Sequence, residues 1–138
     1  MGGVKATLRT RRSKMGERTR NLEWRQRGRE YAPSDVYEQT LAATTDTCVI
    51  THPIVRVDST AGAVTTFTLP NGEPGQVLII ISDHGNDVDV VPTLSLTFSA
   101  IALDDIGDQA TLFYVNDTVG WIILGLIGQA NAVLYTAA

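Results

Sequence analysis

From Leu41 onward, apolar and polar residues alternate in short runs that turn sequences separate at a spacing of about ten residues. Residues 61–70 alternate with the period of two that is expected of a strand with two different faces. Residues 76–82 (QVLIIIS) form a continuous apolar run, which predicts a strand covered on both faces. The intervening residues 71–75 (NGEPG) contain Asn-Gly and Pro-Gly, both of which indicate a turn.

The remaining segments of the body continue this pattern. Residues 47–57 are rich in β-branched side chains, with Pro53 expected at an edge or a break. Leu94, Leu96 and Phe98 alternate within residues 88–101, which predicts another strand. Turn sequences precede and follow the apolar residues 110–115, and a second apolar run, residues 121–127, comes after them; residues 132–135 are either a last strand or a tail.

Roughly seven or eight short strands with almost no helical signal predict a mainly β fold. We expect a small antiparallel β-sandwich or jelly-roll-like domain, with a small barrel as the alternative. This domain is expected to span residues 41–138. An extended basic N-terminal arm and linker, residues 1–40, precede it, because glycines interrupt the arm and its apolar residues form no helical stripe. We expect the arm to become ordered against a partner.

The charge distribution supports this division. The chain has a net charge of −4, but residues 1–30 carry ten cations against three acids, or +7. Residues 31–138 carry one cation, Arg56, against twelve acids, or −11. A basic arm on an acidic domain is typical of a protein that binds a partner through the arm.

Several functional classes are disfavoured. The N-terminus has no apolar run of signal-peptide length, and the longest apolar stretches are too short to span a bilayer, so no membrane partner is expected. Cys48 lies in an apolar strand and is expected to be a buried packing thiol, while His52 is expected at a strand end. Residues 81–85 (ISDHG) are better explained as a turn than as a serine site. We expect no enzymatic activity, no catalytic residue and no cofactor.

Two acidic loops leave one alternative open. Oxygen-rich loops can hold Ca²⁺, although Asp, Asn and Gly are also the residues that turns prefer. Neither loop matches an EF-hand, and the body has few aromatic residues to line a sugar cleft between paired carboxylates. We therefore predict no metal site and keep calcium as the weaker hypothesis. The residues concerned are Asp83, Asn86, Asp87 and Asp89 in one loop and Asp104, Asp105 and Asp108 in the other.

The arm has three interpretations: binding of a protein surface, binding of nucleic acid, or a solvated tail. Arginine can bind both carboxylates and phosphates, and a tryptophan can anchor in a pocket or stack on a base. Glu17, Glu23 and Glu30 interrupt the basic residues, which favours a charge pattern matched to a folded protein. The predicted partner-binding residues are Arg9, Arg11, Arg12, Arg18, Arg20, Trp24, Arg25, Arg27 and Arg29.

Four segments of the body together resemble the β-rich structural proteins of tailed bacteriophages, which include capsid decoration (cement) proteins and tail or fibre modules. They are Thr68–Gly72 (TLPNG), Gly75–Ile81 (a glycine and an apolar strand), Ile101–Asp108 (IALDDIGD) and Gly120–Leu124 (GWIIL). The resemblance covers about 60 residues, and its motifs are turns and packing positions.

This resemblance implies a virion protein, made in the host cytoplasm, that binds and stabilises the assembled phage capsid. The implied partner is the major capsid protein, and the β-domain is expected to be a homo-oligomer, a trimer. A tail or head-fibre module is one alternative. A virion protein that binds nucleic acid through the basic arm is the other.

Overall fold

The computed structural model of the chain describes residues 31–135. The chain divides into two units, residues 1–33 and 34–138, and the fold described here is that of the second. A 3-10 helix at Pro33–Asp35 leads into ten β-strands. They are β1 (Val36–Leu41), β2 (Thr45–Thr47), β3 (Ile54–Ser59), β4 (Thr65–Leu69), β5 (Val77–Ser82), β6 (Val88–Pro92), β7 (Phe98–Leu103), β8 (Gln109–Tyr114), β9 (Trp121–Ile127) and β10 (Asn131–Leu134).

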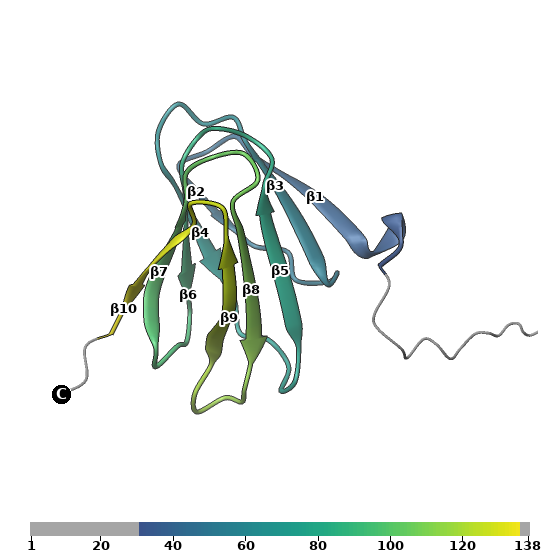
Figure 1. Ribbon diagram of the computed structural model, residues 1–138, viewed down its shortest axis with the longest axis vertical. Helices are drawn as coiled ribbons and strands as arrows, with labels where there is room; N and C mark the ends of the chain where they lie inside the picture. The colour runs from purple at the N-terminus through teal and green to yellow at the C-terminus, as the bar shows by residue number, and fades with distance from the viewer. Residues whose placement is uncertain (1–30, 136–138) are drawn as a thin grey trace, which may run out of the picture. The chain divides into compact units, whose positions relative to one another are not determined.

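The strands form two five-stranded sheets that pack against each other around one hydrophobic core (Figure 1). The first sheet has the order β1-β3-β5-β8-β9, and the second has the order β10-β7-β6-β4-β2. The mainly β sandwich that the sequence predicts is therefore confirmed.

The first six strands alternate between the two sheets. Within each sheet they pair in parallel, β1 with β3 and β3 with β5 in the first, β2 with β4 and β4 with β6 in the second. A parallel pair needs a crossover of about a dozen residues or more, and here each crossover includes a strand of the opposite sheet. From β7 onward the pairings are antiparallel. The sheets are therefore mixed, whereas the sequence predicted antiparallel pairing throughout.

The core consists of the inward-facing residues of both sheets. Its largest fully buried side chains are aromatic: Trp121, Tyr114, Phe67 and Phe98. Trp121 and Tyr114 pack edge to face, with 5.1 Å between their ring centroids, and the indole Nε1 donates to the carbonyl oxygen of Pro70 at 2.8 Å. That hydrogen bond satisfies the indole's single polar group, so the ring can be buried without a desolvation penalty.

Three local features refine the sequence prediction. β1 begins at Val36, within the segment expected to be linker. Residues 88–101 are two strands rather than one, because β6 ends at Pro92 and a turn precedes β7; Leu96 lies exposed in that turn. Residues 132–135, predicted as a strand or a tail, belong mostly to β10.

Candidate functional site

The nine arm residues predicted to bind a partner, Arg9 to Arg29 with Trp24 among them, lie outside the described residues. Within residues 31–135 the candidate sites are an apolar sheet face, an ion-pair cluster, the acidic loops and two shallow pockets.

The outer surface of the first sheet carries a group of apolar side chains beside charged and polar ones such as Glu38, Arg56 and Gln109. In strands β3, β5 and β8 alternate residues are fully buried, and the residues between them face outward. The register aligns these outward residues across the sheet, Val36 with Ile54 and Ile54 with Ile79 in one row. A second row joins Val77 to Phe113 and Phe113 to Ile122. We call this surface the apolar outer face; its residues are Val36, Ile54, Val77, Ile79, Ile81, Phe113 and Ile122.

The second sheet has an outer surface of a different character. Its outward positions on β2, β4 and β6 are mainly threonines and one aspartate, with Thr45 opposite Thr66 and Thr66 opposite Asp89. A sheet with one polar outer side needs no partner there. The contrast therefore favours the apolar outer face over the outer side of β2, β4 and β6 as a contact surface, because contiguous exposed apolar surface generally marks interaction sites.

Arg56 lies on the outer side of the first sheet, beside Ile81 in the register. Its guanidinium forms ion pairs with Glu38 (2.9 Å) and Asp83 (3.3 Å). All three side chains are about half exposed, so solvent screens the pairs and each contributes little to stability. Because Arg56 is the only cation in residues 31–138, its pairing leaves the described β-domain with no unpaired cation to offer a phosphate.

The two acidic loops do not converge on a metal site. Within residues 31–135 no group of three or more His, Cys, Asp or Glu side chains is arranged to hold an ion. Asp108 instead has a structural role: its carboxylate accepts backbone N–H groups from Asp104 (3.0 Å), Asp105 (3.1 Å) and Gln129 (2.7 Å). Burial alone would raise the pKa of Asp108, but these three hydrogen bonds outweigh it and lower the pKa. Burial and the neighbouring carboxylates raise the pKa of Asp104.

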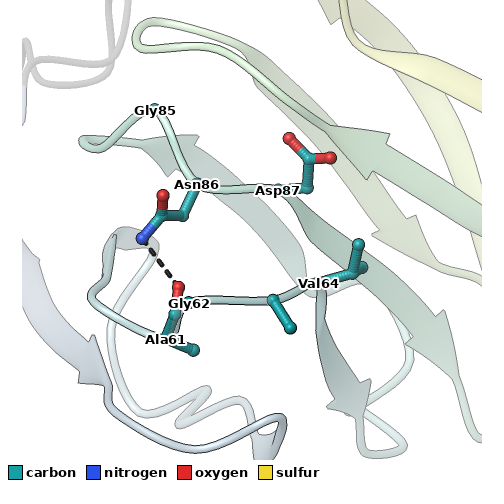
Figure 2. Close-up of a pocket in the computed structure, with 7 residues that line it drawn as sticks. Ala61, Gly62, Val64, Gly85, Asn86 and Asp87 are labelled. Atoms are coloured by element: carbon teal, nitrogen blue, oxygen red, sulfur yellow. Dashed lines mark hydrogen bonds between the residues drawn. The ribbon is translucent and has the colours of Figure 1, made fainter.

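A shallow pocket lies between the β3–β4 and β5–β6 loops (Figure 2). Its volume is about 250 Å³, and small side chains form most of its wall. Asn86 ties the two loops together by donating to the carbonyl oxygens of Ala61 (2.7 Å) and Ser59 (3.0 Å). The Asn86 amide hydrogens are therefore used within the fold, which makes this residue a loop clamp rather than a ligand-binding group.

A larger depression of about 570 Å³ lies at the turn of residues 71–76, next to Ile50. Gln76 organises the turn: its Oε1 accepts the Glu73 N–H (2.9 Å) and its Nε2 donates to the Ile50 carbonyl (3.1 Å). A side chain at Gly72 would collide with Trp121, which explains the glycine in this turn. The polar groups of Gln76 are paired within the turn, so they do not project into the depression as ligand donors.

The candidate nucleophiles lack catalytic surroundings. Cys48 is buried, as predicted, and burial followed by the charge of Asp46 raises its pKa to about 12. The thiolate that nucleophilic attack requires is therefore scarce at neutral pH. His52 stacks on Tyr37 with 5.5 Å between ring centroids, and its Nδ1 lies 2.9 Å from the Thr51 hydroxyl. Ile81 and Ser82 end β5, and the predicted turn follows them; the Ser82 hydroxyl donates to the His84 carbonyl there (2.8 Å).

Sequence reasoning missed the apolar outer face. The available signal is the apolar run at residues 76–82, which predicts a strand covered on both faces. In the structure Leu78 and Ile80 are fully buried, but Val77 is 37% exposed and Ile79 and Ile81 are only partly buried. No described residue forms a third layer over this strand. The apolar run therefore forms a strand that packs on the core with one face and leaves its other apolar face partly exposed.

Comparison with known proteins gives little further information. No protein-family model matches the chain, and no curated protein matches it with significance. Among solved structures, one described as "Structure of a chaperone-substrate complex" matches with a TM-score of 0.44 and 21% sequence identity. The match covers 70% of this chain and 19% of that one. In the part of the chain that the structure describes, no helix has the length and apolar character to cross a bilayer.

Proposed function

We propose that the chain is a structural protein of a tailed-bacteriophage virion, a capsid decoration (cement) protein that binds and stabilises the assembled capsid. The observation that carries the proposal is the apolar outer face of the first sheet. A β-sandwich that has contiguous apolar residues on one outer side suits a module that lies on another protein surface. The resemblance of the turns and strands of residues 68–124 to phage structural proteins supports the same conclusion.

In this proposal the chain has two points of attachment. The β-domain places the apolar outer face on the major capsid protein, and the basic arm, with a charge of +7, binds acidic groups of that protein. A ligand that binds the assembled shell but not its separated subunits stabilises the shell by mass action. Several arms in one oligomer, a trimer as the resemblance implies, would add avidity.

Binding to capsids tests the proposal directly. Empty expanded capsids of the phage whose genome encodes the chain are incubated with the full-length protein, and bound copies and capsid melting are measured. We expect binding to saturate a lattice of equivalent sites and to raise the melting temperature of the shell. Val77→Lys, which places a charge on the apolar outer face, should weaken binding at least tenfold. The matched change Thr66→Lys on the outer side of the second sheet should not. Absence of capsid binding by the wild-type protein would refute the proposal.

A tail or fibre module is the second candidate, and the winding of β1–β6 favours it. Strands that alternate between two sheets and pair in parallel form coils that can stack on further coils along one axis, as in solenoid proteins. Copy number separates the two candidates. A decoration protein covers the capsid lattice, whereas a fibre component occurs in a few copies per particle.

A further inference from the structure

The side of the sandwich that ends in β9 and β10 carries no charge. These strands are the last in their sheets and are joined by a short turn (Figure 1). Residues 118–138 contain no Asp, Glu, Lys or Arg, although residues 31–117 hold twelve acids. The opposite edge differs, because β1 carries Glu38 and β2 carries Asp46. Proteins commonly place charges on edge strands to prevent association, and this edge lacks that protection.

The same edge exposes large apolar side chains. Of the ten exposed large hydrophobic residues in the described part of the chain, five fall within residues 124–135. Their exposed fractions lie between 55% and 65%; they are Leu124, Ile127, Val133, Leu134 and Tyr135. Other residues of the two strands, Ile123, Leu126 and Ala132, pack against the core. The strands are therefore anchored in the fold while they present a second set of apolar groups to solvent.

Both edge strands are irregular. The pairing of β9 with β8 shifts register between Thr111 and Leu112, so that Leu124 has no opposite partner, and β10 shifts between Val133 and Leu134. Bulges of this kind interrupt the addition of a further strand. We therefore expect a contact at this edge to be made by side chains rather than by a continuous β-ladder.

We propose that the β9–β10 edge is a self-association surface that binds a second copy of this chain. An uncharged apolar surface is complementary to itself, whereas the surfaces that carry the twelve acids of a domain with a net charge of −11 would bring like charges together. Five side chains of this size expose roughly 500 Å² per copy, so two copies reach the ~1,000 Å² that a specific interface needs. The inference rests on the proposed function, because it names a surface through which two copies of the proposed virion protein associate.

The test measures the mass of the full-length protein by sedimentation equilibrium over a range of concentrations. We expect the wild-type chain, whose monomer mass is 14.9 kDa, to self-associate with a Kd on the order of 10 µM. The double variant Leu124→Lys/Leu134→Lys should weaken association at least 100-fold, because it places cations in an apolar contact. The control is Val64→Lys, a change of the same chemistry on the β3–β4 loop, where the side chain is 45% exposed; it should associate like the wild type.

A salt series separates this contact from attraction between the arm of one copy and the acidic domain of another. At 0.5 M NaCl the Debye length is only about 4 Å, so an association between charged groups weakens. An apolar contact persists at the same salt concentration. A wild-type chain that stays monomeric at ~100 µM would overturn the proposal. So would association that the double variant retains or that salt abolishes.

Two controls keep the outcome interpretable. If the double variant lacks the far-UV circular dichroism of the wild type, the single variants Leu124→Lys and Val133→Lys, which alter one strand each, decide the matter. Capsid binding is measured separately. Monomeric wild-type protein whose capsid binding depends on this edge would assign the edge to the capsid protein, refuting self-association and leaving the proposed function in place. A wild-type protein that self-associates through this edge but does not bind capsids would refute the proposed function and leave self-association in place.

Discussion

Asp108 holds together two loops at one end of the sandwich. Its carboxylate receives N–H groups from the segment that follows β7 and from the turn that joins β9 to β10. The residue is 2% exposed, so no solvent replaces these bonds if they are lost. The turn is fitted closely to the carboxylate, because a side chain at Gly128 would collide with it. In the sequence Asp108 was one of several acids and a weak calcium candidate; its role as an acceptor of backbone hydrogens could not be distinguished there.

Replacing Asp108 with asparagine should destabilise the domain by about 2 kcal/mol at pH 7, since hydrogen bonds to a charged acceptor are lost or weakened. The folded-state pKa of Asp108 lies below its unfolded value, so its contribution is present above about pH 4 and is lost as pH falls through the folded pKa. Urea unfolding from pH 7 to pH 2 measures this dependence. The wild type should lose more stability on acidification than Asp108→Asn.

The control is the same change at the neighbouring Asp105, whose carboxylate receives none of the three backbone hydrogen bonds. Asp105→Asn should alter the free energy of unfolding by less than about 0.5 kcal/mol. Equal losses for the two variants would show that Asp108 contributes only as one acid among many.

At the scale of strands, the sequence pattern was sufficient to place most elements but not to pair them. The runs at residues 77–82, 109–114 and 121–127 form β5, β8 and β9 close to where they were predicted. A half-buried strand has the same alternation whether its neighbour runs parallel or antiparallel, so the mixed pairing was not predictable from that pattern. The alternation of β1–β6 between sheets depends on contacts between strands 18 to 25 residues apart in the sequence.

The turn after β6 shows how a local signal was misinterpreted. Leu94, Leu96 and Phe98 alternate as in a strand, but the Ser95 hydroxyl organises a turn at this point. It accepts N–H groups from Thr97 (3.1 Å) and Phe98 (3.2 Å) and donates to the Trp121 carbonyl (2.8 Å). Serine commonly forms such local bonds with the backbone, and they compete with strand pairing. Because one of these bonds reaches a residue 26 positions away, the turn depends on tertiary structure.

For the two apolar surfaces, too, the sequence shows which residues are apolar but not which of them are exposed. The residues of the apolar outer face were visible in the sequence as apolar positions, but their exposure depends on which strands flank β5 and on the lack of a further described layer. The edge of residues 118–135 was visible as a run without charge. That this run forms an exposed edge depends on the position of β9 and β10 at the ends of their sheets, which the sequence pattern does not show.

The β8–β9 hairpin gives a prediction at this scale. Gly120 has a φ of 78°, and a side chain there would overlap the carbonyl of Leu94, which accepts the Trp121 N–H (3.0 Å). Gly120→Ala should therefore destabilise the domain by roughly 2–4 kcal/mol, since it combines backbone strain with a collision against main chain. Thermal or urea unfolding measures the change. Gly62→Ala is the matched control, because Gly62 lies in open space without a positive φ, and a loss of similar size there would contradict the explanation.

For the whole molecule, the separation of charge limits how the chain can meet nucleic acid. All but one of its eleven cations lie in residues 1–30, and the remaining one, Arg56, is paired with Glu38 and Asp83. The rest of the chain has a net charge of −11 and should repel a phosphate backbone. Any binding to DNA must therefore come from the arm, against the field of the β-domain. DNA binding therefore distinguishes an arm that binds nucleic acid from an arm that binds a protein surface.

We expect the full-length protein to bind random-sequence duplex DNA weakly at low salt and to lose that binding by physiological salt. A chain lacking residues 1–30 should not bind at all. An arm that makes six or more phosphate contacts would lose on the order of 10³-fold in affinity between 50 and 200 mM salt. Fluorescence anisotropy across a salt series, with the full-length protein and with the protein lacking residues 1–30, measures how the affinity for DNA depends on salt concentration. Affinity that depends on the arm and remains tight near 150 mM salt would place the arm on a genome rather than on a capsid protein. Weak binding that salt abolishes would leave a folded acidic surface as the better target, because interspersed Glu17, Glu23 and Glu30 penalise a polyanion but can pair with a patterned protein surface.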